Sequence, residues 1–440
     1  MERVSPEVLS IILTHLAANP TQECPLAPYA TVTRSWQYIV ETFSFKNITI
    51  KSKEIQSFAR IFSGPGRHRR CLLRQLYYNI GLPTHGDSRG DHATNERAFG
   101  SAIQSLFDLL ESWDQEYDGN HRGKDGSITW RNHPNVQLNI WLSYEVDIKN
   151  ADGPVDHAFN VCNSSAARRY HTLPPEFKVS QVHCVNTLEF GASLGRAPHP
   201  ATFCQIASLL PCLECLDLTY WDPAVKRHDT RKEHRVALAD GLRALSGKLP
   251  KLERLCIRRQ DGVDPSNHSF VCGDLQRDGV DTLCDAIRHL AETCHLKELQ
   301  LENIMISPDL FRPSPARKGM PIVDQEPTTF SGLRRLDIKT GILAPSGRWY
   351  YMGDPASVEA SEGDFILDED NYTEGDTDSD DSGDEDNSTR DRFVNGARPH
   401  HEWRTRPDPE TFNPLVQDFT DTMLKRMPSL QWASLEIGLL

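Results

Sequence analysis

A six-residue pattern of apolar side chains, Leu-x-x-Leu-x-Leu/Ile, recurs along the chain and restricts its fold more than any other feature. The four strong copies are LECLDL at 213–218, LERLCI at 252–257, LKELQL at 296–301 and LRRLDI at 333–338. Weaker copies are VNTLEF at 185–190 and LQWASL at 430–435, and a further possible strand is VQLNIWL at 136–142. Side chains alternate between the two faces of a β-strand, so the second and third apolar residues of each copy share one face. The pattern predicts a series of strands that each bury one face.

An apolar segment of helical length precedes several of these strands. The segments are ATFCQIASLLP before 213, HRVALADGLRALSGKLP before 252, GVDTLCDAIRHLAETCH before 296 and TFNPLVQDFTDTMLKRMP before 430. Strands joined by helices lie parallel, with the helices on the outside of the sheet. One helix–strand unit cannot bury its apolar face alone, and stacking of units solves this. The expected fold class is therefore α/β, as an irregular solenoid with parallel strands.

The repeated strands resemble those of leucine-rich-repeat proteins. Repeats of that family are about 20–29 residues long, whereas the second leucines here, from Leu188 to Leu336, are 28 to 44 residues apart. The Asn or Cys that usually follows the strand is also replaced, by Trp221, Gln260, Ile304 and Gly341. The resemblance implies an irregular solenoid and not a regular horseshoe. An ordinary α/β sheet whose buried strands share a pattern is the alternative.

A short and strongly apolar helix is expected at the start of the chain, in SPEVLSIILTHLA, residues 5–17. Ser5 can cap this helix and Pro6 suits its first position. A second apolar face follows in residues 26–50, which end in a short alternating segment, FKNITI. About fifty residues with short helices cannot bury this much apolar surface well. The unit is therefore expected either to cap the following domain or to offer its surface to a partner helix.

These two segments resemble an F-box, over little more than a tenth of the 440 residues. The first helix of that family is matched by Pro6, Leu9, Ile12, Leu13 and Leu16, and its Val-Cys/Ser-Arg-x-Trp segment is matched by Val32, Arg34 and Trp36. The chain departs from the family at Val4-Ser5, where a Leu is usual, and at Thr33, where Cys or Ser is common. With the leucine-rich remainder, the chain resembles the expanded F-box proteins of filamentous fungi.

This resemblance implies a substrate-recognition adaptor of an SCF-type cullin–RING ubiquitin ligase. The residues implied to bind the Skp adaptor are Pro6, Leu9, Ile12, Leu13, Leu16, Val32 and Trp36. A target protein would bind the open face of the strands, where the residues that flank the leucines are expected: Glu189, Asp217, Arg254, Arg258, Glu298, Glu302, Arg335, Asp337, Lys339 and Trp432. Their mixed charge favours a protein partner over a polyanion. The alternative function is a leucine-rich-repeat scaffold with no ligase role.

The net charge of −14 is concentrated in one stretch of the chain. Between Trp349 and Thr389 there are fifteen Asp and Glu residues and no Lys or Arg, so the remainder is nearly neutral. A segment so rich in like charge and poor in apolar residues is expected to be disordered. The expected domains are a helical unit at 1–50, the solenoid at 51–345, an acidic insertion at 346–408 and a last helix–strand repeat at 409–440.

Sequence patterns typical of enzymes or cofactor sites are not found. No nucleotide-binding, metalloprotease or serine-hydrolase motif occurs, so we expect no enzyme and no cofactor. Cys212 and Cys215 have zinc-type spacing but no second pair, and the basic cluster RHRR at 67–70 is too compact for an extended nucleic-acid interface. No apolar run approaches the about 18 residues of a membrane span. Eleven scattered cysteines without a secretory signal suggest reduced thiols in the cytoplasm or nucleus.

Overall fold

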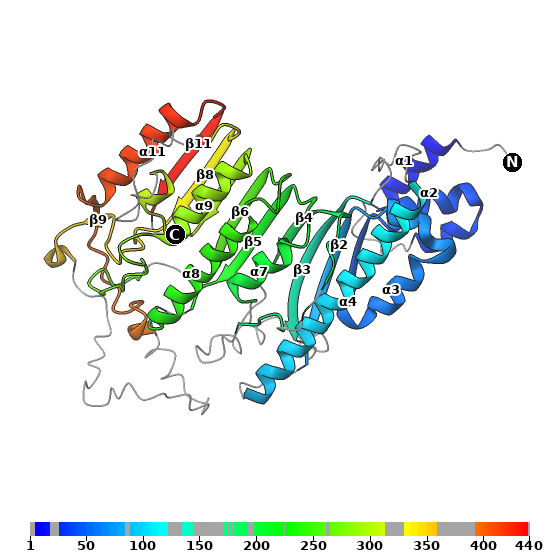
Figure 1. Ribbon diagram of the computed structural model, residues 1–440, viewed down its shortest axis with the longest axis horizontal. Coiled ribbons are helices and arrows are strands. Elements are labelled where there is room, and N and C mark those ends of the chain that lie inside the picture. The colour runs from blue at the N-terminus through cyan, green and yellow to red at the C-terminus, as the bar shows by residue number, and fades with distance from the viewer. Residues whose placement is uncertain are drawn as a thin grey trace.

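Nine parallel β-strands form one continuous sheet in the computed structural model of the protein (Figure 1). The structure describes residues 5–17, 26–83, 89–121, 134–144, 170–174, 177, 179–191, 198–223, 225–260, 265–312, 330–358 and 392–438. The strands lie side by side in chain order: β1 (Asn47–Lys51), β2 (Gln75–Leu82), β3 (Val136–Tyr144), β4 (Val185–Phe190), β5 (Cys215–Trp221), β6 (Arg254–Gln260), β7 (Glu298–Glu302), β8 (Arg335–Thr340) and β11 (Trp432–Ile437). The predicted α/β class with parallel strands is confirmed.

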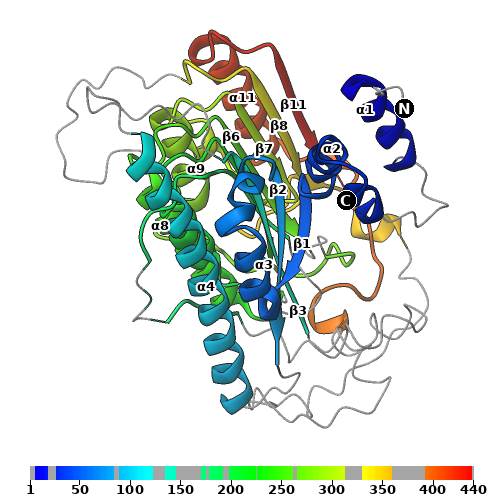
Figure 2. The same ribbon diagram turned by 90° about the vertical axis from the view of Figure 1, so that its right-hand side faces the viewer.

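The helices that connect the strands gather on one side of the sheet, as Figure 2 shows for α3, α4, α8 and α9. The α-helices of this layer are α3 (Ile55–Ile61), α4 (Arg89–His121), α7 (Pro200–Ala207), α8 (His228–Leu245), α9 (Thr282–Thr293) and α11 (Phe412–Arg426). Short 3-10 segments are η2 (Ser52–Glu54), η3 (Gly64–Cys71), η6 (Pro308–Leu310) and η7 (Pro355–Ser357). Among the described residues, the connecting helices return over this one face, and the opposite face of the sheet carries no layer of helices.

The leucines of the repeats line the face that packs on the helices. Leu188, Leu216, Leu255, Leu299 and Leu336 stand in register on five neighbouring strands and are at most 2% exposed. In the four strong copies the strand begins two residues after the start of the repeat pattern. The first leucine of the strong copies is therefore buried in the turn before the strand.

The N-terminal helices form a separate small unit that leads directly into the sheet. The N-terminal helical unit consists of α1 (Pro6–Ala17), η1 (Ala27–Thr31) and α2 (Arg34–Ser44). It has its own apolar cluster, apart from the main core. The following strand β1 pairs with β2, so it belongs to the sheet. The boundary expected at residue 50 therefore lies before residue 47.

The flanks of the expected acidic insertion are folded, so its predicted limits of 346 and 408 are wrong. Two short antiparallel strands, β9 (Tyr351–Met352) and β10 (Arg406–Pro407), pair across it. The Arg404 guanidinium lies 4.1 Å from the ring centroid of Trp403 and 4.9 Å from that of Trp349. Residues 359–391, which hold most of the acidic side chains, lie outside the described residues.

No helix in the described part of the chain is both long and apolar enough to cross a membrane.

Candidate functional site

The open face of the sheet carries three rows of side chains, which alternate along each strand with the buried leucines. The first row runs through Thr187, Cys215, Arg254, Glu298, Arg335 and Trp432. The second row runs through Glu189, Asp217, Cys256, Gln300, Asp337 and Ser434, and the third through Thr219, Arg258, Glu302, Lys339 and Glu436. All ten residues predicted for a target-binding face lie in these rows. The predicted strand register is therefore correct, although this placement does not test target binding.

Ion pairs within the open face hold neighbouring strands together. Arg258 of β6 donates to Asp217 of β5 at 2.6 Å and to Glu302 of β7 at 3.2 Å. The Arg335 guanidinium lies 4.7 Å from the ring centroid of Trp432, which links β8 to β11. These side chains therefore stabilise the sheet itself, and only part of their charge is available to a partner.

A polar and aromatic patch on β2, β3 and β4 was predicted only at Glu189. It consists of Tyr77, Gln137, Asn139, Trp141 and Glu189, all on the open face. We define these five residues as the amide–aromatic patch. Sequence reasoning treated the β3 segment only as a possible strand, although its polar and apolar residues alternate from 137 to 142.

The N-terminal helical unit buries part of the predicted Skp-binding set. Leu9 and Leu13 are 2% and 0% exposed and pack against Val40. Trp36 is partly buried, and its ring stacks on Tyr29 with the centroids 6.0 Å apart. Leu9 and Leu13 are therefore buried inside the unit in this conformation, and their role in binding the Skp adaptor stays a prediction.

The surface of the same unit is nevertheless apolar. Ile12 and Val32, both predicted, are 41% and 57% exposed, and Val8 and Ile11 are 48% and 58% exposed. We define these four residues as the aliphatic face. The side chains of Pro6 and Leu16 lie outside the part of the structure that is described.

The basic cluster RHRR joins structural elements, although the side chains of Arg67 and His68 remain 40% and 50% exposed. Glu41 of α2 accepts a hydrogen bond from Arg69 at 2.7 Å, and its other oxygen lies 2.7 Å from Nε2 of His68. Arg70 of the same cluster pairs with Glu116 of α4 at 2.9 Å. Burial raises the pKa of Glu41, but the hydrogen bonds from Arg69 and His68 outweigh it and lower the pKa to about 2. This ionised carboxylate attaches the helical unit to the sheet.

The nine cysteines in the described part of the chain are present as thiols, and none of them belongs to a group placed to hold a metal ion. Cys215 lies on β5 and Cys212 in the turn before it, where Nζ of Lys251 is 3.5 Å from the Cys212 sulfur. Burial raises the pKa of the Cys204 and Cys256 thiols to about 12, which keeps them protonated at neutral pH. Within the described ranges, no group of three His, Cys, Asp or Glu side chains is placed to hold a metal ion.

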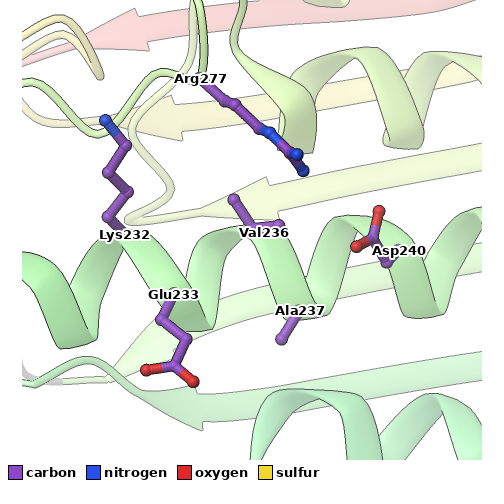
Figure 3. Close-up of a pocket in the computed structure, with 6 residues that line it drawn as sticks. All are labelled: Lys232, Glu233, Val236, Ala237, Asp240 and Arg277. Atoms are coloured by element: carbon purple, nitrogen blue, oxygen red, sulfur yellow. The ribbon is translucent and has the colours of Figure 1, made fainter.

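A shallow depression lies on the outer side of α8 (Figure 3). Its lining residues are Lys232, Glu233, Val236, Ala237, Asp240 and Arg277. The side chains of Lys232, Glu233 and Asp240 point in different directions (Figure 3), so they do not converge on a bound group. A small-molecule site with convergent polar groups is not formed there.

The buried His234 and the half-buried His199 are expected to make the fold sensitive to acid. His234 of α8 is 5% exposed and its ring packs edge-on against Tyr170 and His199, with centroids 4.1 and 4.8 Å away. Burial, followed by the charge of His199, lowers the pKa of His234 to about 4. His199 accepts the N–H of Ala201 at the start of α7, and burial lowers its pKa as well.

We therefore predict that the free energy of unfolding falls as the pH drops from about 6.5 to about 4. In that interval the unfolded chain binds a proton at His234 that the folded chain does not, so the loss is roughly 3 kcal/mol and stops near pH 4. Urea unfolding at several pH values measures this dependence. The free energy of unfolding of His234→Phe should change less with pH than that of the unmodified chain. His289→Phe, on the exposed side of α9, is the matched control, and an equal slope in both variants would contradict the assignment.

The chain matches no protein-family model, no curated protein and no solved structure. The function is therefore argued from the two surfaces described above, which are the aliphatic face and the open face of the sheet.

Proposed function

We propose that the protein is a substrate-recognition adaptor of an SCF-type cullin–RING ubiquitin ligase. The N-terminal helical unit acts as an F-box-like domain that docks on the Skp adaptor. The solenoid, built from leucine-rich-repeat-like units, binds a target protein on its open face. The adaptor itself performs no chemistry, and ubiquitin transfer depends on holding the target near a charged conjugating enzyme. Such an adaptor acts in the cytoplasm or nucleus.

The observation that carries the proposal is the aliphatic face. Val8, Ile11, Ile12 and Val32 are between 41% and 58% exposed on a unit of three short helices. The unit has buried Leu9, Leu13 and Val40 as a core of its own, so the aliphatic face is not needed for its folding. A cluster of exposed aliphatic residues on a helical unit is typical of a surface that receives another protein.

The attachment of this unit supports the same function. Arg69 and His68 hold α2 through Glu41, and the chain passes from α2 directly into β1. A target on the open face is therefore kept at a fixed distance from whatever holds the helical unit. Proximity catalysis requires such a fixed geometry.

The test is co-elution of the purified full-length chain with a purified Skp-type adaptor in size-exclusion chromatography. We expect a stable one-to-one complex at micromolar concentrations. Absence of a complex, with the chain folded and with other proteins still bound through the open face, would support the alternative of a scaffold with no ligase role.

A further inference from the structure

A buried side-chain amide in the middle of the open face has no hydrogen-bond partner in the described part of the chain. Asn139 of β3 is 1% exposed, and neither its Nδ2 nor its Oδ1 makes a hydrogen bond. Its cross-strand neighbours are Tyr77 on β2 and Glu189 on β4, and Gln137 and Trp141 flank it along β3. Buried polar groups in native proteins nearly always find a partner, and the exceptions tend to have a functional explanation.

The neighbouring carboxylate of Glu189 has no cation at ion-pair distance among the described residues. Its one hydrogen bond comes from Nε2 of Gln137 at 3.5 Å, which is long. Asp217, on the adjacent strand, forms an ion pair with Arg258 at 2.6 Å. The Arg258 guanidinium therefore does not form an ion pair with Glu189. Burial, and then the charge of Asp217, raises the pKa of Glu189. A cation brought to Glu189 would relieve both effects.

The third element is the indole of Trp141, which packs over Gly191, two residues after Glu189 in the chain. A Cβ atom built on Gly191 would come within 2.3–2.5 Å of three ring carbons of Trp141, so the ring rests on the glycine backbone. Trp141 is 39% exposed, so one face of the ring is open to solvent. Gly191 comes directly after the end of β4 and two residues after Glu189, so the ring packs on the chain segment that carries this carboxylate.

We propose that the amide–aromatic patch binds an extended segment of the target protein through an arginine side chain. The inference rests on the proposed function in that the segment belongs to the protein delivered to the ligase. The guanidinium stacks on Trp141 and donates two N–H groups to Glu189, an arrangement that lysine cannot reproduce. A backbone peptide group of the same segment supplies the donor and the acceptor that the Asn139 amide needs.

Access to the Asn139 amide requires one neighbouring side chain to move. Gln137 is unbranched, and among the described residues its side chain makes only the long hydrogen bond to Glu189, so it turns away most easily. A carbohydrate would also stack on Trp141, but its hydroxyl groups would leave the charge of Glu189 uncompensated. The carboxylate therefore favours an arginine-containing peptide over a sugar.

The test uses pools of nonapeptides with one fixed central residue, incubated with the purified full-length chain. We expect retention of arginine-centred pools at least tenfold above alanine-centred pools, with lysine in between. Glu189→Gln and Trp141→Ala should each reduce the retention tenfold or more. Asp240→Asn, which removes a carboxylate that is 64% exposed on α8 and lies outside the open face, is the matched control and should leave it unchanged.

Asn139→Leu gives a second readout that a merely structural residue would not produce. It removes an unpaired buried amide, so the thermal midpoint should rise while the retention of arginine-centred pools falls. A lower midpoint with unchanged retention would overturn the inference. So would equal retention of all pools, or glycan-array binding that depends on Trp141 and Glu189.

The outcome can be separated from that of the proposed function. If arginine-centred pools bind but the Skp adaptor does not, the patch is a peptide site without a ligase role, and the adaptor proposal fails alone. If the Skp adaptor binds but no pool is preferred, the proposed function stands and the inference about arginine is wrong.

Discussion

Replacing Asp281 by alanine is expected to destabilise the protein by about 3–5 kcal/mol. Asp281 is fully buried and accepts two hydrogen bonds from Arg235, at 2.9 and 2.8 Å. Burial raises the pKa of Asp281, but the charge of Arg235 outweighs it and lowers the pKa. The carboxylate also caps α9 by accepting from the backbone of Leu283. Its removal leaves a buried guanidinium without a counter-charge, which is the costly half of a broken buried pair.

The measurement is urea unfolding of the purified variant at neutral pH. Asp240→Ala removes a carboxylate from the solvent side of α8, where Asp240 is 64% exposed and only 3.4 Å from Arg243. Surface pairs of this kind contribute little, so that control should change the free energy of unfolding by less than about 1 kcal/mol. The double variant Arg235→Met, Asp281→Asn removes both charges of the pair. Its free energy of unfolding should therefore fall by less than that of Asp281→Ala. Equal effects of Asp281→Ala and Asp240→Ala would show that the buried pair does not hold α8 to α9.

The strand positions could be predicted because the repeat couples the local pattern to the overall fold. Burial of Leu216, Leu255, Leu299 and Leu336 in one line requires neighbouring parallel strands in register, and no other arrangement of helix–strand units satisfies all four. The open face then follows from alternation alone. This is why the ten open-face residues were placed correctly before the contacts of any one of them were known.

Other parts of the fold escaped prediction for different physical reasons. The helix α4 has a clear helical period of buried residues, including Phe99, Ile103, Leu110 and Trp113, but it precedes no strong leucine pattern. The flanks of the acidic segment contain Pro and Gly, which suggest a linker, yet contacts distant in sequence bury Trp349 and Trp403. The composition of a segment does not predict that it folds when its folding depends on contacts with residues distant in the sequence.

The helical unit shows the limit of periodicity most clearly. Spacing places Leu9, Ile12 and Leu13 on one face of α1, and the structure divides that face. Leu9 and Leu13 point into the unit, whereas Ile12 remains 41% exposed. The division depends on the angle at which α2 crosses α1, and no spacing within a single helix encodes that angle. Val8 and Ile11 were missed for the same reason, because they extend the exposed side and not the buried side.

Paired changes of Ile11 and Val32 to aspartate are expected to weaken binding of the Skp adaptor about 100-fold. Both side chains are more than half exposed, so the unit should stay folded. Each loses roughly 1 kcal/mol of apolar burial at the interface, and each introduces a charge that the interface must desolvate. A combined loss of about 3 kcal/mol corresponds to the expected change in affinity. Titration of the labelled adaptor into the full-length variant measures it.

Two further variants separate loss of contact from loss of folding. Val271→Asp changes an aliphatic residue that is 89% exposed and lies outside the helical unit, so it controls for added surface charge. Leu13→Ala removes a fully buried side chain and should cost about 2–5 kcal/mol of local stability. It should therefore weaken adaptor binding together with a loss of helical circular dichroism. If the paired aspartates bind the adaptor as the unmodified chain does, the aliphatic face is not the docking surface, because two buried charges cannot be accommodated without a measurable loss.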